Sequence, residues 1–292
     1  MTSLLELVTE PLGFAFMQRA LVAAVLIGAV CAALSCYLVL KGWSLMGDAI
    51  SHAVLPGIVI AHVVGLPLGV GAFAAGLASA LATGYLKENS RVKEDTVLGI
   101  VFSGMFGFGL VLFTRIETDQ HLNHILFGNI LGVSPAELAE IAIIGGGTLL
   151  LVLARRRDFL LLIFDPQHAK AIGLPVRALH YAFLIALSLT IVAALKAVGI
   201  ILVVAMLVGP GATAFLLTDR FERMLAIAAA VSIGSAVIGT LSSFHLDAAT
   251  GPMIVLTQAA VFLAAFVLAP RRGLLAHRRA RRTDRAQTVL SE

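Results

Sequence analysis

The sequence predicts an all-α membrane protein, a polytopic bundle of about nine transmembrane helices. Of the 292 residues, 59% are hydrophobic and only 13% are charged, whereas soluble domains carry about 25% charged residues. The mean hydropathy is +0.99. Apolar runs recur along the whole chain at the length of about 20 residues that spans a bilayer. This composition excludes an ordinary cytosolic enzyme, a secreted disulfide scaffold and a disordered chain.

The apolar runs divide the chain into nine expected spans, or eight if two short runs merge. Glu6 and Glu10 precede the first span, where a signal peptide would carry basic residues, so we expect this span to be retained. We expect the spans at about 17–40, 44–64, 66–86, 97–115, 138–154, 178–196, 199–217, 224–242 and 253–269.

The basic residues predict the orientation of these spans. Seven arginines follow Pro270, and cytoplasmic segments are enriched in Lys and Arg. With the C-terminus inside and the N-terminus outside, 18 of the 21 Lys and Arg residues fall on the cytoplasmic side, and Arg19, Arg115 and Lys196 are the exceptions. We therefore predict one membrane domain over 1–270 and a basic cytoplasmic tail over 271–292. The net charge of +4 is explained by orientation and lipid contact, without nucleic acid.

Asp48 is the acidic residue that this arrangement places inside a span. It follows Lys41 by seven residues, which is about 10 Å if the segment is helical. His52 follows at i+4 on the same face, near the expected midplane, and His62 continues the stripe toward the outer mouth. Ionisable groups at this depth are costly and usually line a polar path.

A carboxylate and an imidazole at this spacing can point at one bound ion. Oxygen and nitrogen donors suit manganese, iron or zinc. Two ligands make a weak site, as transport requires, and a symmetric dimer would double them. A proton relay and a buried structural pair remain alternatives for Asp48 and His52. For His62, the alternative to a metal role is an ordinary interfacial histidine.

Four segments together resemble the permeases of ABC-type manganese, zinc and iron importers. They are Lys41–Gly57, Lys93–Ser103, His124–Leu131, and Val198–Leu207 followed by Pro210. The resemblance covers about residues 15–270. It implies a multi-pass permease in the cell (inner) membrane, with Asp48 and His52 carrying the ion at mid-membrane. It also implies ATP-binding subunits on the cytoplasmic side, an extracytoplasmic metal-binding protein and a second permease copy, identical or related.

The chain is not expected to hydrolyse ATP, because no G-x-x-x-x-G-K-[ST] run occurs in it. The segment Asp165–Pro175 predicts a short cytoplasmic helix, with Asp165 as N-cap, Pro166 in the first turn and Gly173 after the end. Ala169, Ile172 and Leu174 would form a small apolar face. An ordinary linker is the alternative, but the resemblance implies a helix that couples the permease to its ATPase.

Gly209 and Pro210 are expected to break the seventh span, either as a hinge, as a wall of the pore, or as a packing kink. We thus expect import of a divalent ion by alternating access, with manganese first and iron or zinc next, because the manganese-type permeases are the most similar. The ion is cargo, and no permanent cofactor is expected. The alternatives are a proton-coupled secondary transporter of a metal or small solute, and a membrane scaffold.

Overall fold

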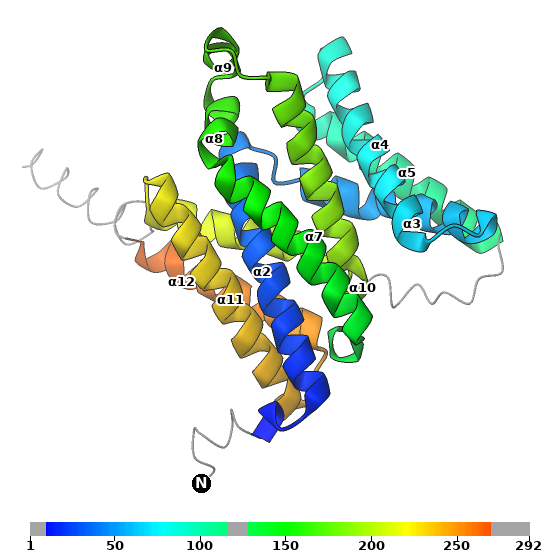
Figure 1. The fold of residues 1–292 in the computed structure, drawn as a ribbon, viewed down its shortest axis with the longest axis vertical. Coiled ribbons are helices and arrows are strands. Elements are labelled where there is room, and N and C mark those ends of the chain that lie inside the picture. Colours follow the sequence, from blue (N-terminus) through cyan, green and yellow to red (C-terminus); the bar gives the residue numbers. More distant parts are fainter. Residues whose placement is uncertain (1–9, 116–127, 270–292) are drawn as a thin grey trace, which may run out of the picture.

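The computed structural model describes residues 10–115 and 128–269, and every regular element within them is helical (Figure 1). The basic tail predicted for 271–292 lies outside these residues, as does the start of the segment His124–Leu131. In chain order the elements are α2 (Ala15–Lys41), α3 (Met46–Val64), α4 (Leu68–Asn89), α5 (Glu94–Arg115), the 3₁₀ turn η1 (Ile130–Gly132), α7 (Pro135–Ala154), α8 (Arg156–Phe164), α9 (Pro166–Ala171), α10 (Val176–Leu217), α11 (Phe221–Leu246) and α12 (Thr250–Leu268).

The prediction of nine spans, rather than eight, is confirmed for the described part of the chain. Nine helical segments there are long and apolar enough to cross a membrane. Two of them lie in α10, over Val176–Leu195 and Ala197–Leu217. Gly199 divides α10 because its backbone (φ 72°, ψ 170°) is not helical, a conformation that glycine adopts without steric cost.

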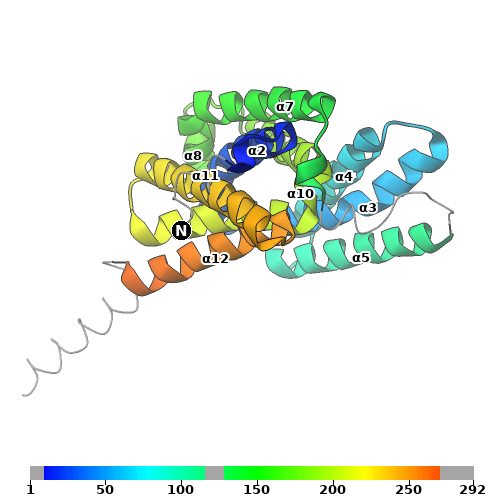
Figure 2. The same cartoon turned by 90° about the horizontal axis from the view of Figure 1, so that it is seen from below.

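The bundle is built around α2. Helices α7, α10 and α11 pack against it, while α3, α4 and α5 form a group that joins the rest through α10 (Figures 1 and 2). Tyr37 of α2 is fully buried, and its ring lies 6.1 Å from Phe159 of α8, 6.0 Å from Phe183 of α10 and 5.0 Å from Phe221 of α11. This aromatic cluster fixes the end of the bundle from which α9 protrudes.

Helix α3 is held between α4 and α5 by glycines. A Cβ atom on Gly57 would collide with the backbone of Gly71 on α4, and one on Gly71 would lie 2.5 Å from the Cβ of Ala61. On the other side, a Cβ on Gly109 of α5 would lie 2.8 Å from the Cδ of Pro56. Small residues allow helix backbones to approach this closely in membranes. The start of α3 is therefore positioned by a close helix crossing further along the same helix.

Candidate functional site

The chain turns between Lys41 and Asp48, so these residues do not share a helix. Gly42 ends α2 with a left-handed backbone (φ 73°), and its N–H donates to carbonyls of the last turn. Helix α3 begins at Met46, which places Asp48 in its first turn. The expectation that Asp48 lies about 10 Å beyond Lys41 along one continuous helix is therefore wrong. Asp48 reaches a cavity because the first turn of α3 lies beside α10 and α12.

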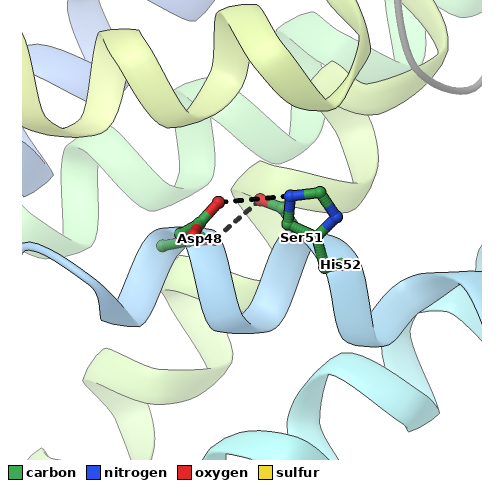
Figure 3. Close-up of polar contacts among 4 residues, drawn as sticks. Asp48, Ser51 and His52 are labelled. Carbon is green, nitrogen blue, oxygen red and sulfur yellow. Dashed lines mark hydrogen bonds and ion pairs between the residues drawn. The ribbon is translucent and has the colours of Figure 1, made fainter. Parts of the chain in front are cut away.

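Asp48 and His52 form the predicted pair. The Nε2 atom of His52 lies 3.3 Å from Oδ1 of Asp48, and the two side chains are 20% and 32% exposed (Figure 3). Between them on the helix, the Ser51 hydroxyl donates to the carbonyl of Gly47 at 2.7 Å and is buried. The carboxylate and imidazole thus share the one open face of this turn.

Two phenylalanines of α5 hold the His52 ring. The ring centroids of Phe102 and Phe106 lie 4.8 Å and 4.9 Å from that of His52, both edge to face. The Nδ1 atom of His52 is buried and has no hydrogen-bond partner among the described residues. The imidazole is therefore presented through Nε2, the atom beside Asp48. Phe102 lies in the Lys93–Ser103 segment, but spacing along the sequence could not show that it reaches His52.

The distance between Oδ1 of Asp48 and Nε2 of His52 is suitable for two ligands of one metal ion. Two ligand atoms that each lie about 2.1 Å from one ion are about 3.0 to 3.4 Å apart, for ligand–metal–ligand angles of about 90° to 109°. The observed 3.3 Å falls in this interval. Within residues 10–115 and 128–269, no three side chains of the His, Cys, Asp and Glu types gather to hold a metal. If an ion binds between Asp48 and His52, the described part of one chain therefore offers it two strong donors.

His62 does not join this pair. It lies in the last turn of α3 and is exposed, ten residues beyond His52, or about 15 Å along a helix. Leu55 and Val59, which continue the stripe between them, are buried. Buried apolar side chains therefore separate His62 from the Asp48–His52 pair.

Asp48 opens onto a cavity of about 560 Å³ formed by α3, α10 and α12. Gly209, one of the two predicted hinge residues, lies in the same wall. Gln258 of α12 also lines the cavity and is a residue that the sequence analysis missed. The sequence did contain a signal for Gln258, because a glutamine is unusual within a mostly apolar predicted span. The lining comprises Ser44, Leu45, Asp48, Val204, Ala205, Val208, Gly209, Ala212, Val255, Gln258, Ala259 and Phe262.

Helix α10 continues through Pro210, contrary to the expected break at Gly209 and Pro210. The non-helical residue of α10 is Gly199. At Pro210 the Ser35 hydroxyl of α2 supports the backbone: it accepts from the N–H of Gly211 at 2.9 Å and donates to the carbonyl of Val208 at 3.2 Å. A side-chain hydroxyl from a neighbouring helix can satisfy backbone groups that proline disturbs. Gly209 therefore forms part of an intact wall.

The short helix predicted for the segment after Asp165 is present as α9. The Asp165 carboxylate accepts from the N–H of His168 at 2.8 Å, Pro166 is the first helical residue, and Gly173 follows the helix with a left-handed backbone (φ 83°).

The bundle fully covers one of the three residues of the expected apolar face and partly covers a second. Ala169 is fully buried, and Leu174 packs against the core of the bundle. The exposed apolar side chains at this end are Ile172, at 57% exposure, and Phe164, at 65%. Ala169 and Leu174 therefore hold the segment onto the bundle and leave Ile172 and Phe164 facing outward.

The comparison with known proteins gives one family. The model of the ABC 3 transport family matches residues 13–269. The chelated iron transport system membrane protein YfeD of Yersinia pestis is 63% identical over 267 residues, which are 91% of this chain and 90% of the relative. The manganese transport system membrane protein MntB of Synechocystis is 49% identical over 287 residues, or 96% and 94% of the two chains.

A solved structure is also similar to this chain in both fold and sequence. PsaBC from Streptococcus pneumoniae, in complex with Fab, matches with a TM-score of 0.82 and 38% sequence identity. The match covers 92% of this chain and 97% of that one. The family model and the relatives therefore span the nine helical segments of the described bundle, and the chain belongs to the ABC 3 transport family as a multi-pass membrane permease.

Proposed function

We propose that this permease carries a divalent metal ion into the cytoplasm for an ATP-driven importer. The observation that supports the proposal most directly is the Asp48–His52 pair, with Asp48 in the wall of a mainly apolar cavity. The relatives named above are described as iron and manganese transport proteins. Mixed oxygen and nitrogen donors accept Mn²⁺, Fe²⁺ and Zn²⁺. The expectation that manganese-type permeases are the most similar is not confirmed, because the iron relative is 63% identical and the manganese relative 49%. We propose Mn²⁺ or Fe²⁺ ahead of Zn²⁺, because these are the metals in the relatives' descriptions.

In this proposal Oδ1 of Asp48 and Nε2 of His52 bind the ion directly. Phe102 and Phe106 keep the imidazole in place, so the ion does not have to order it. Two donors from one chain hold the ion weakly, and a second permease, identical or related, brings further donors. Weak, incomplete coordination allows the ion to leave after it has bound.

Directional movement requires partners on both faces. An extracytoplasmic binding protein delivers the ion, and separate ATP-binding subunits dock at the end of the bundle that carries α9. ATP binding and hydrolysis in those subunits move α9, and the cavity beside Asp48 opens alternately to the two sides. Asp165, Pro166 and Gly173 shape α9 for this role, and Ala169 and Leu174 transmit its movement because they pack against the bundle.

Cellular metal content tests this proposal. The permease is expressed with its candidate ATPase and binding protein in cells that lack their own uptake systems, and manganese, iron and zinc are counted by mass spectrometry. We expect one of these metals to rise, and the rise to disappear when the ATPase carries a substitution of its Walker A lysine. Uptake that persists with the inactive ATPase would instead favour the proton-coupled transporter.

Ile172→Asp is expected to lower metal uptake by about tenfold or more. The substitution places a charge on the exposed apolar position next to α9, and loss of one buried interface anchor typically costs more than about 1.4 kcal/mol, a factor of ten. Uptake and co-purification of the ATPase are measured together. Gln167→Ala, on an exposed polar position of α9, is the matched control. Equal uptake by the two variants would remove Ile172 from the docking surface.

A further inference from the structure

Gln258 is a buried amide without a partner. Its side chain is 2% exposed, and neither Oε1 nor Nε2 makes a hydrogen bond within the described residues. Leaving a buried polar group unpaired is costly, and the described protein covers both polar atoms of this amide. The neighbouring Thr257 satisfies its hydroxyl within the helix, because that hydroxyl donates to the carbonyl of Met253 at 2.9 Å. The amide of Gln258 makes no such hydrogen bond to its own helix.

The amide lies directly on Gly209. A Cβ atom built on Gly209 would be 3.0 Å from Cδ, 3.2 Å from Cγ and 3.3 Å from Oε1 of Gln258. Because Gly209 has no side chain, the amide of Gln258 can occupy the space that a side chain at position 209 would fill. Both residues belong to the wall of the cavity that also exposes Asp48. Helices α3, α10 and α12 thus bring a carboxylate and a neutral amide to one cavity.

Packing alone does not account for an amide at this position. Methionine has a similar volume and an unbranched chain, and it would cover Gly209 without leaving two polar atoms unsatisfied. A partner that enters the cavity lined by Gln258 would offset this cost. Because the proposed cargo of this cavity is a divalent cation, the amide oxygen is the atom that it would meet.

We propose that Gln258 is a specificity-determining residue of the ion path, an inference that rests on the proposed function. Its Oε1 contacts the ion or the ion's bound water when α10 and α12 separate at Gly209, and the amide is covered again when they close. A neutral oxygen adds a ligand without adding charge, so the ion remains free to leave. Mn²⁺ accepts additional oxygen ligands, whereas Zn²⁺ favours four-coordinate sites with nitrogen or sulfur. Gln258 therefore favours Mn²⁺ over Zn²⁺.

The test compares Gln258→Met with Thr257→Val in the complete complex of permease, ATPase and binding protein, reconstituted into vesicles. Initial uptake rates of Mn²⁺ and Zn²⁺ are measured over a range of concentrations, and thermal unfolding is followed without added metal. We expect Gln258→Met to raise the KM for Mn²⁺ about tenfold, to change that for Zn²⁺ much less, and to leave the Tm unchanged or higher. Thr257→Val should leave the Mn²⁺ to Zn²⁺ ratio unchanged.

The failures of the two proposals are distinguishable in the same assay. If Gln258→Met keeps the Mn²⁺ to Zn²⁺ ratio while Asp48→Asn abolishes uptake, Gln258 has no part in specificity and the proposed function stands. A lower Tm for Gln258→Met, with both metals affected equally, would show that the amide is structural and would also overturn the inference. If Asp48→Asn transports both metals normally, the proposed ion site itself is wrong, and the inference falls with it.

Discussion

Asp48→Asn is expected to lower metal uptake by about hundredfold at matched expression. Asparagine keeps the size of the side chain but removes the negative charge, so the ion loses its charged ligand and retains only Nε2 of His52 as a strong donor from this chain. A hundredfold effect corresponds to about 2.7 kcal/mol, a modest value for a direct ligand, because loss of an outer-shell partner alone costs about 10- to 100-fold. Metal content of cells carrying the complete importer is the measurement.

His52→Ala tests the other half of the pair, and Ser51→Ala is the matched control. Ser51 lies between the two residues, but its hydroxyl is buried and bonds within the helix to Gly47, so its loss should change uptake little. His52→Ala should reduce uptake as Asp48→Asn does. If Asp48→Asn and His52→Ala both accumulate metal at the wild-type rate while the permease is present in normal amount, the ion binds elsewhere.

Gly57→Leu is expected to prevent normal folding of the permease or to lower its Tm by at least about 5 °C. A Cβ atom at position 57 already collides with the backbone of Gly71, so α3 and α4 must separate to admit a leucine. Overpacking of this kind costs about 1 to 3 kcal/mol or more, and each kcal/mol shifts Tm by about 2 to 4 °C in a chain of this size. Yield and thermal unfolding in detergent are the measurements.

Gly104→Leu provides the control for this substitution. Gly104 lies on α5, where a built Cβ would meet no atom within 4 Å apart from its chain neighbours and the adjacent backbone of its own helix, and the residue is exposed. Replacing a helical glycine there removes its entropic penalty without a clash. We expect wild-type yield from Gly104→Leu. An equal loss of Tm in the two variants would mean that the α3–α4 crossing is not the reason for the effect of Gly57→Leu.

Hydropathy and helix-end chemistry predicted the parts of this fold that are local in the sequence. The nine spans follow from runs of apolar residues, and α9 follows from an N-cap, a proline and a glycine at fixed positions. The Asp48–His52 pair likewise follows from i, i+4 spacing. These features need no knowledge of which helices are neighbours.

The predictions failed where a neighbouring helix decides the outcome. Position 169 looked like part of an exposed apolar face, but the bundle covers it. Pro210 looked like a helix break, but Ser35 of α2, far away in the sequence, supports the backbone there. Gln258 is a candidate site residue because α12 shares a cavity with Asp48, which the sequence does not show. Contacts between distant segments leave no periodic signal in a single sequence.

The bridge made by Ser35 constrains the mechanics of transport. Bending α10 at Pro210 away from α2 would break two hydrogen bonds, one of them buried and the other partly buried. Straightening or tilting α10 together with α2 breaks neither. If the proposed transport cycle moves α10, we therefore expect α2 to move with it as one rigid unit and the other helices to rearrange around the pair.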